Sequence, residues 1–376
     1  MKTHSNRYTA LDVFRGMTIC FMIIVNSPGA GAVPYGPLNH AVWHGFTPTD
    51  LVFPSFLFAV GNALSFSERK FSAMPSAKVL STVFKRAFII FLLGFLMYWF
   101  PFFKVGEQGS IVFFPFSETR VFGVLQRIAL CYLCTALLVR FVRTRYLLGI
   151  GALLLVVYWA LLVLFGTGDP FSLEGNAIFK LDLWLFGEAH LYHSHGVLFE
   201  PEGLLSTLPA IVNTLAGYLA GRYLQQKASS GESLKHLALF GLLAIVLALC
   251  WNPWFPINKK IWSSTFTLLT VGLDLLILPV LVLISENAEK KPREWTSFFT
   301  ILGKNPLFIY LLSEIGLISL GIFPIGGSSY YERINLEWIQ PLLPGPAGSF
   351  LFALLFMLSC WLVGWYLDKK RIYIRV

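Results

Sequence analysis

Two histidines, a tryptophan and an aspartate are gathered in the segment HAVWHGFTPTDLVFP, residues 40–54. His40 is the first candidate for a catalytic group, since histidine is the side chain that exchanges protons near neutral pH. It could act as a general base or, as a nucleophile, accept an acyl group itself. Asp50 could orient this imidazole and stabilise its charged form. The competing interpretation places His40 and His44 beside Trp43 in an aromatic belt.

Asn26 closes an apolar stretch within IIVNSPG. An amide in this place can donate a hydrogen bond to a developing oxyanion. It can equally cap a helix end before the Ser-Pro-Gly turn. Both interpretations of Asn26 stay open, and His40, Asp50 and Asn26 are the predicted catalytic residues.

A second group of histidines lies in HLYHSHG, near Glu202. The spacing suggests a metal site, but metal-binding histidines normally sit on a regular element with a carboxylate at a fixed offset. This segment has no such periodicity, so we expect no metal and prefer a loop that recognises an acceptor substrate. The predicted substrate-binding residues are therefore His44, Trp43, His190, His193, His195 and Glu202.

Charged side chains inside apolar stretches cost about 2.5–3.5 kcal/mol each on insertion scales. Arg127, in GVLQRIAL, has Gln126 beside it and no acid nearby in the sequence. Its partner must be an anionic ligand such as a phosphate or a distant residue, with Asp274 and Glu314 as the alternatives. Arg15 follows Asp12 by three positions on one helix face, where an ion pair explains it as well as a function does.

Lys304 and Asn305, in LGKNPLFIY, could contact a ligand that enters from the cytoplasm. The Asn305-Pro306 pair also suits a simple helix start. Both interpretations remain at this stage.

Membrane-spanning helices must position these residues. Of 376 residues, 56% are hydrophobic and 13% are charged, whereas a soluble domain carries about 25% charged residues. A spanning helix needs about 20 mostly apolar residues. The sequence therefore predicts a single all-α polytopic domain, residues 1–376, with about ten transmembrane helices near 9–27, 50–67, 84–101, 121–140, 146–166, 205–222, 235–251, 261–285, 299–322 and 349–368. Its long outer loops are predicted at 28–49, 102–120, 167–204 and 323–348.

The net charge of +9 comes from lysines and arginines that concentrate on alternate connections, such as the run between residues 69 and 86. By the positive-inside rule this side is cytoplasmic, so both termini are predicted to face the cytoplasm. The charges are scattered over short loops rather than gathered on one face. Membrane lipids are therefore the expected contact, and nucleic-acid binding is excluded.

Several segments carry a resemblance to a known family. They are ALDVFRGMTICFMIIVN, HAVWHGFTPTDLVFPSFLFAVG, GVLQR, PEGLLSTLPAIVNTLAG, NKKIWSSTF, GKNPLFIY and LDKKRIYI. In this order they resemble the transmembrane acyltransferases typified by heparan-alpha-glucosaminide N-acetyltransferase. The first two segments are long and specific, and the others gain weight from their order.

The resemblance implies an enzyme that moves an acetyl group from cytoplasmic acetyl-CoA, as co-substrate, to an amine or hydroxyl of an amino sugar or glycan on the outer side. His40 stands at the family's essential histidine, Asn26 at its asparagine after the first span, and Asp50 at the aspartate that opens the second. Arg127 matches an arginine associated with the coenzyme. The expected coenzyme-binding residues are Arg127, Gln126, Arg15, Asn305 and Lys304.

Within this resemblance we expect the chain to depart from the animal enzyme in lacking its extra luminal domain and in carrying His44 where the family has an asparagine. We therefore expect a relative of the bacterial type, in the inner membrane, with an acceptor other than heparan. A homodimer is left open. The alternative from another class is a sugar or sugar-acid transporter without chemistry.

Overall fold

The computed structural model describes residues 9–105, 110–194, 197–227, 230–286, 294–322, 324–325 and 328–374. The chain is an all-α, multi-pass integral membrane protein in which short hairpins are the only strands of the described ranges. It divides into two compact units, one formed by residues 1–40, 47–56 and 275–375 and the other by 41–46 and 57–274.

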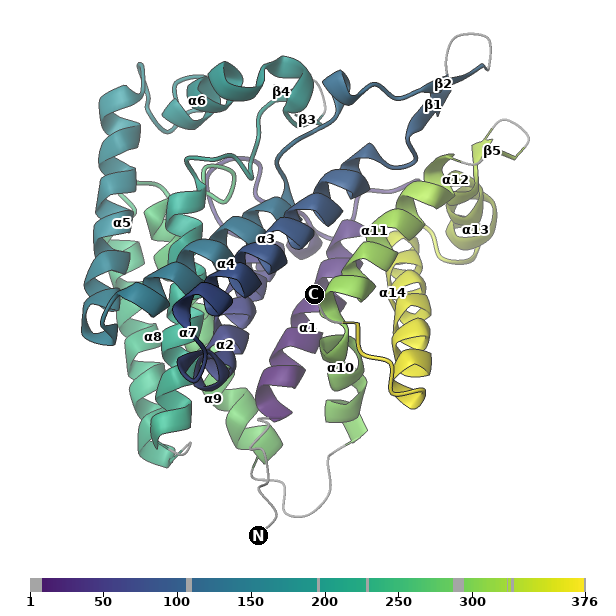
Figure 1. The fold of residues 1–376 in the computed structure, drawn as a ribbon. Coiled ribbons are helices and arrows are strands. Elements are labelled where there is room, and N and C mark those ends of the chain that lie inside the picture. The colour runs from purple at the N-terminus through teal and green to yellow at the C-terminus, as the bar shows by residue number, and fades with distance from the viewer. Residues whose placement is uncertain are drawn as a thin grey trace. The chain divides into compact units, whose positions relative to one another are not determined.

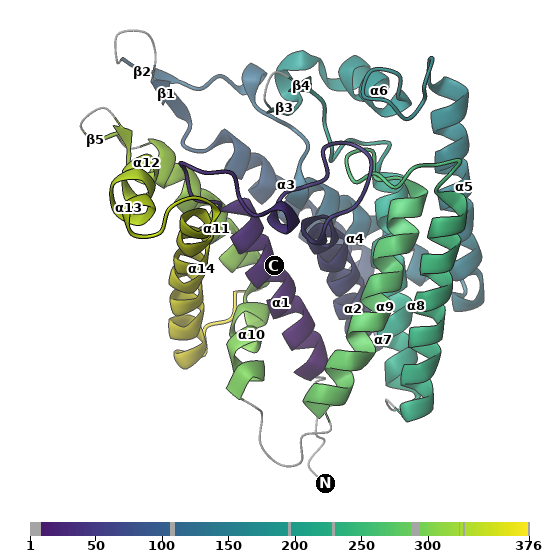
Figure 2. The ribbon, with the colours of Figure 1, turned by 180° about the vertical axis from the view of Figure 1, so that it is seen from behind.

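The first unit is built around helix α1, which packs along α10 and α14 (Figures 1 and 2). A Cβ atom on Gly16 would overlap the backbone of Phe299, and one on Gly303 would overlap the backbone of Asp12. Small residues let membrane helices approach this closely, so α1 and α10 touch backbone to backbone. The elements of this unit are α1 (Thr9–Asn26), 3₁₀ turns at Gly36–Leu38 and Pro48–Leu51, α10 (Glu294–Lys304), α11 (Pro306–Ile322), β5 (Pro324–Ile325), β6 (Ser328–Ser329), α12 (Tyr330–Arg333), a π-helical turn (Ile334–Ile339), α13 (Gln340–Leu342) and α14 (Pro346–Lys369), together with the start of α2 and the end of α9.

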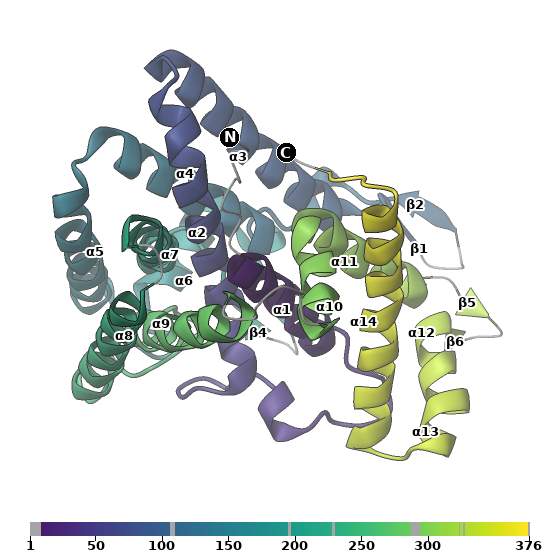
Figure 3. The ribbon, with the colours of Figure 1, turned by 90° about the horizontal axis from the view of Figure 1, so that it is seen from below.

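The second unit packs α3 on α4 and places α7 against α4 and α5, as Figure 3 shows from below. Gly61 of α2 and Gly217 of α7 again face backbone atoms of the neighbouring helix. An aromatic and aliphatic core includes Tyr158, Ile178 and Phe255. Its elements are α2 (Val52–Ser72), α3 (Ser76–Trp99), β1 (Phe103–Val105), β2 (Ile111–Phe113), a 3₁₀ turn (Phe116–Glu118), α4 (Val124–Phe141), α5 (Thr144–Phe165), α6 (Ala177–Phe186), a 3₁₀ turn (Glu188–His190), β3 (His193–Ser194), β4 (Val197–Leu198), α7 (Thr207–Lys227), α8 (Gly231–Trp251) and α9 (Ser264–Glu286).

Eight of the predicted spans are helices long and apolar enough to cross a membrane within the described ranges, namely α1, α2, α3, α4, α5, α8, α9 and α14. The span predicted at 205–222 forms the 21-residue helix α7, which does not reach the same hydropathy. Its polar residues Asn213 and Thr214 are fully buried, so neighbouring helices rather than lipid surround them. The side of the membrane on which the termini lie stays a prediction.

The span predicted at 299–322 is not one continuous helix. The chain forms α10 and α11, which meet at an angle of 82°. Proline lacks the backbone N–H that would continue the helix, and it disfavours helical geometry at the preceding residue. Asn305 and Pro306 therefore mark a break, with Pro306 as the first residue of α11.

Candidate active site

His40 and Asp50 form a hydrogen-bonded dyad in the first unit. His40 Nδ1 lies 2.7 Å from Asp50 Oδ1. The carboxylate is fully buried, whereas 42% of the imidazole side chain is exposed. An ionised carboxylate only accepts hydrogen bonds, so Nδ1 carries the proton and donates it. The basic lone pair of the neutral ring then lies on Nε2, the atom that could take a proton from a substrate.

The first turn before α2 holds the Asp50 carboxylate. Asp50 Oδ2 accepts a hydrogen bond from Thr47 N at 2.9 Å, which is half of a capping box. The Thr47 hydroxyl lies 3.1 Å from the same oxygen and donates to Asn39 O at 2.7 Å. The sequence T-x-x-D therefore fixes the carboxylate and the backbone next to His40 at once.

Asn26 is the last residue of α1, and its amide contacts a carboxylate. Asn26 Nδ2 donates to Glu314 Oε1 of α11 at 3.1 Å, on an exposed part of the unit. The amide nitrogen carries two protons, so this bond leaves one donor for a ligand. Glu314 is a residue that the sequence did not place in the site.

One cavity is lined by residues that neighbour the three predicted catalytic residues in the chain. Val25, Leu38 and Thr49 all line a cavity of about 290 Å³. Asn26 and Asp50 directly follow two of these lining residues in the chain, and His40 comes two positions after the third. Chain neighbours of all three predicted catalytic residues therefore line this cavity, and the catalytic roles of Asn26, His40 and Asp50 stay predictions.

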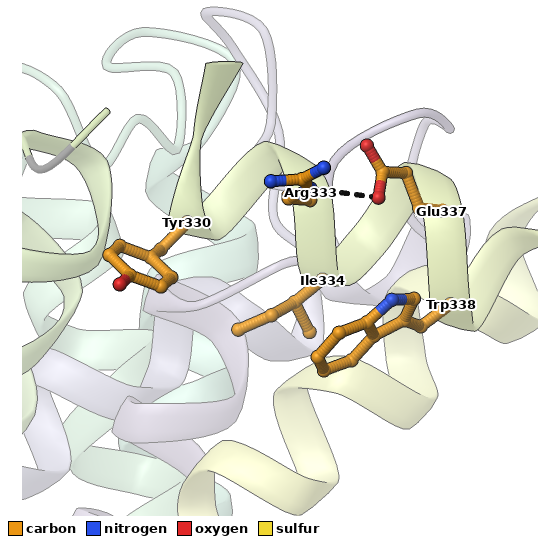
Figure 4. A pocket seen from close by; sticks show the side chains of 5 residues that line it. All are labelled: Tyr330, Arg333, Ile334, Glu337 and Trp338. Atoms are coloured by element: carbon orange, nitrogen blue, oxygen red, sulfur yellow. Dashed lines mark hydrogen bonds and ion pairs between the residues drawn. The ribbon is translucent and has the colours of Figure 1, made fainter. Parts of the chain in front are cut away.

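A smaller cavity of about 230 Å³ lies along α12 and the π-helical turn (Figure 4). Its walls come from one stretch of chain, residues 330–338, and include an ion pair of Arg333 and Glu337 at 2.9 Å. It contains none of the predicted site residues.

In the second unit, His44 and Trp43 belong to a loop that is fastened to residues 257–260. His44 Nδ1 accepts a hydrogen bond from Asn258 Nδ2 at 3.3 Å, and burial lowers the pKa of His44 despite the nearby charge of Asp169. Gly45 N donates to Ile257 O at 2.8 Å. Gly45 has φ +113°, a conformation that favours glycine.

Arg120 is the centre of a buried ion cluster in the same unit. Its guanidinium binds Glu200 at 2.5 and 2.8 Å and Glu202 at 2.8 Å. The rings of Tyr98 and Tyr192 lie 4.7 and 4.5 Å from it. Two carboxylates and two aromatic faces therefore enclose this cation.

The two carboxylates of the cluster differ in their pKa. Burial raises the pKa of Glu200, and the charge of Arg120 offsets only part of this effect. Burial acts on Glu202 as well, but the charges of Arg120, Arg127 and Lys259 outweigh it and hold the pKa of Glu202 below its ordinary value. Glu202 is therefore the more firmly ionised partner.

Arg127 lies in the first turn of α4 and is fully buried. Its Nη2 donates to Gly203 O at 3.0 Å and to the Ser206 hydroxyl, and its guanidinium lies 4.8 Å from the Trp262 ring. Arg127 Nε and Nη1 and both amide atoms of Gln126 are buried without a hydrogen-bond partner in the described part of the chain. A ligand could satisfy them, since buried polar groups rarely stay unpaired.

Comparison with known proteins decides the family. The model of the heparan-alpha-glucosaminide N-acetyltransferase catalytic region matches residues 7–250. The chain belongs to the heparan-alpha-glucosaminide N-acetyltransferase family. The predicted resemblance is therefore confirmed.

Two family members show how far the likeness extends. The chain is 26% identical to heparan-alpha-glucosaminide N-acetyltransferase of Mus musculus over 369 residues, or 84% of this chain and 54% of the relative. It is 26% identical to the Homo sapiens protein of that name over 365 residues, 82% of this chain and 53% of the relative. The chain thus spans about half the length of the curated relatives that it matches.

Other predicted coenzyme residues of this family member have protein partners. Arg15 Nη1 lies 3.2 Å from Gly303 O and 3.5 Å from Asp12 Oδ1. Lys304 Nζ binds both carboxylate oxygens of Asp368 at 2.8 Å. Asn305 exchanges hydrogen bonds with the backbone of residues 372 and 374. Lys304 and Asn305 thus hold the C-terminal segment, and their coenzyme role stays a prediction.

The predicted acceptor loop of this family member is only partly described. His190 Nδ1 donates to Thr119 O at 2.7 Å and His193 Nδ1 to Leu191 O at 3.0 Å, so both rings hold backbone. His195 lies outside the described residues. Within the described ranges no three His, Cys, Asp or Glu side chains are grouped as a metal site would require.

Sequence reasoning considered Glu314 only as a possible partner of Arg127, and it predicted neither the pairing of Asn26 with Glu314 nor that of Arg120 with Glu200. Arg120 and Glu200 are 80 positions apart, and Asn26 and Glu314 are 288 apart. Trp262 offers a further structural signal, because its φ of +49° is rare for a bulky residue. Trp262 lies in the motif NKKIWSSTF, which is the part of the sequence that contributes this ring to the surroundings of Arg127.

Proposed function

We propose that this chain transfers an acetyl group from acetyl-CoA to an amine or hydroxyl of an amino sugar or glycan on the outer side of the membrane. The observation that carries the proposal is the His40–Asp50 dyad, with its buried carboxylate and exposed imidazole. This arrangement suits a general base whose tautomer is set by its neighbour. Membership of the acetyltransferase family supports the reaction class.

In the proposed reaction the acceptor nitrogen or oxygen attacks the thioester carbon. His40 Nε2 takes the proton that the nucleophile loses, a new C–N or C–O bond forms, the C–S bond breaks, and the coenzyme leaves as its thiol with that proton. Asp50 acts as a positioning residue that stabilises the imidazolium. A second scheme has His40 attack first and carry the acetyl group itself. Ping-pong kinetics would support this second scheme, and an obligatory ternary complex would oppose it.

Asn26 and Glu314 suit the acceptor better than the oxyanion. A carboxylate beside a developing negative charge would oppose it, because like charges repel at short range. A protonated amine would instead be attracted to Glu314 and could bind the amide oxygen of Asn26. We therefore assign this pair to an amino group of the acceptor before its deprotonation.

Gln126 and Arg127 are the proposed contacts of the donor. Their unpartnered atoms include donors on both side chains and the amide oxygen of Gln126 as an acceptor. A phosphate offers only acceptors, whereas the amide-bearing arm of acetyl-CoA offers both kinds of group. Because both donors and an acceptor are unpartnered, Gln126 and Arg127 suit the amide-bearing arm of the coenzyme better than its phosphates.

The test is acetyl transfer from labelled acetyl-CoA to a panel of amino sugars by the purified full-length chain. We expect His40→Ala to lower kcat/KM by at least about 10³-fold, in the range of general base loss. The control His236→Ala changes another exposed histidine, in α8, and should keep wild-type activity. Unchanged transfer by His40→Ala would refute the assignment. Uptake of a sugar without transfer to any acceptor would favour the transporter instead.

A further inference from the structure

The cavity beside the catalytic dyad continues as an apolar groove along α1. Five residues on one face of this helix line it: Phe14, Met17, Thr18, Phe21 and Val25. From Phe14 to Val25 the helix rises about 16 Å, at 1.5 Å per residue. The hydrocarbon layer of one leaflet is about 15 Å deep, half of a 30 Å bilayer core. The groove therefore has the length of one leaflet.

The remaining walls of the groove are also apolar and come from the same unit, with Leu51 and Val52 at the start of α2 and Ile277 on α9. Hydroxyl groups are the only polar side-chain groups that line it in the described chain. Thr18 and Thr49 already donate theirs to backbone carbonyls at 2.9 Å. Such walls suit hydrocarbon better than the amide-bearing arm of a coenzyme, which would leave unpaired groups.

The side of the groove is open, and the loop that carries the dyad lines one end of it. Phe21 is 47% exposed although it lines the groove, so a chain could enter sideways from the bilayer. At the end, Leu38 precedes His40 by two residues, a backbone distance of at most about 7 Å. A head group above the groove would therefore reach the imidazole.

We propose that the groove binds the aliphatic chain of a lipid-linked acceptor from the outer leaflet. The amino-sugar head group would then lie at His40 and at the Asn26–Glu314 pair. This inference rests on the proposed function and names its substrate class. The transferred acetyl group has only one methyl carbon, so it does not explain an apolar groove as long as one leaflet.

The experiment compares acceptors that share a head group and differ in chain length. Methyl, octyl and dodecyl glucosaminides are offered with labelled acetyl-CoA to the full chain in nanodiscs. We expect kcat/KM to rise at least about tenfold from methyl to dodecyl, since each buried CH₂ is worth up to about 0.8 kcal/mol. Met17→Trp should fill the groove and remove most of this ratio. Leu239→Trp, on an exposed face of α8, should preserve it.

A second measurement does not depend on turnover. A dodecyl glucosaminide with a diazirine at the chain end should label residues 14–25, and unlabelled dodecyl glucosaminide should compete. Equal labelling by a diazirine phospholipid would mean a structural lipid and overturn the inference. Chain-independent transfer would overturn it too but leave the proposed function intact. Labelling of α1 without transfer to any acceptor would refute the proposed function and, with it, the assignment of the bound chain to an acceptor.

Discussion

The dyad of His40 and Asp50 and the cluster of Arg120, Glu200 and Glu202 use buried carboxylates in opposite ways. In the dyad one partner is fully buried and the other is 42% exposed, so a titrating ring faces outward. In the cluster, Arg120 is 16% exposed and closed in by two carboxylates and two tyrosine rings. The enclosed ion cluster has little capacity left to form hydrogen bonds or ion pairs with a substrate, whereas the exposed imidazole of the dyad can still form them.

The comparison teaches that burial of charge by itself does not mark chemistry. Both regions contain a carboxylate without exposure, Asp50 and Glu200. What separates them is whether the partner group can still exchange a proton with a ligand. We therefore expect changes in the cluster to act on stability and changes in the dyad to act on rate.

The largest effect should come from opening the cluster. Glu200→Gln removes one carboxylate charge from buried Arg120, and loss of one partner of a buried pair costs about 3 kcal/mol or more. Thermal or denaturant unfolding in detergent at pH 8 would measure the loss. The matched control is Glu118→Gln, which breaks the exposed pair with Lys104 and should cost less than about 1 kcal/mol. Similar losses of unfolding free energy in Glu200→Gln and Glu118→Gln would contradict the structural role assigned to the buried cluster.

A smaller loss, seen in rate alone, is expected for Asp50→Asn. An amide at this position cannot accept from both the imidazole and Thr47 N, so the ring would lose its Nδ1–H tautomer. We expect kcat/KM for acetyl transfer to fall at least about 10²-fold while the unfolding free energy changes by less than about 1 kcal/mol. A large loss of stability with an unchanged rate of the folded fraction would contradict the assignment.

Asp182, a buried carboxylate in α6 that accepts a hydrogen bond from Leu204 N at 3.1 Å, provides a pH-dependent test in the second unit. Burial raises the pKa of Asp182 to about 6, against about 3.9 when unfolded. The folded state then binds the proton more tightly, so stability falls as pH rises from about 4 to 6 and levels off above. Relative to Asp182→Asn, the free energy of unfolding of the wild type should fall by about 2 kcal/mol between about pH 4 and pH 6. A difference between wild type and Asp182→Asn that stays flat over this pH range would refute the effect.

The smallest effect is expected for Thr47→Ala. This change removes the hydroxyl that joins Asn39 O to the Asp50 carboxylate, and loss of such a cap costs about 1 kcal/mol. Unfolding experiments should find this loss together with a modest fall in rate. Thr82→Ala removes a hydroxyl that bonds only within its own exposed helix turn and serves as the control. Equal losses for the two variants would mean that the Thr47 bond has no special role.

The sequence could predict the dyad because its members lie in one loop. His40 and Asp50 are ten positions apart, and Thr47 with Asp50 forms a readable helix-start signal. Apolar length also predicted where most helices run, although α3 begins at Ser76 rather than residue 84, because polar residues extend the helix past the apolar stretch. Hydropathy describes lipid contact and not the end of backbone hydrogen bonding.

Pairings over long sequence distances could not be predicted in this way. Nothing local in the sequence joins Arg120 to Glu200 or Asn26 to Glu314, since only the packed helices bring them together. The break at Asn305 was also ambiguous, because proline is suited both to the first turn of a helix and to the end of the preceding one. Packing decides between these outcomes.

Asp50 takes part in the capping box before α2 and in orienting the imidazole. Fraying of this one turn would therefore abolish the proposed acetyl transfer while every helix remained in the bilayer. On gentle heating, activity should vanish some degrees below the cooperative melting of the fold. Thermal inactivation would then report on the turn Pro48–Leu51 rather than on the unfolding of the whole protein.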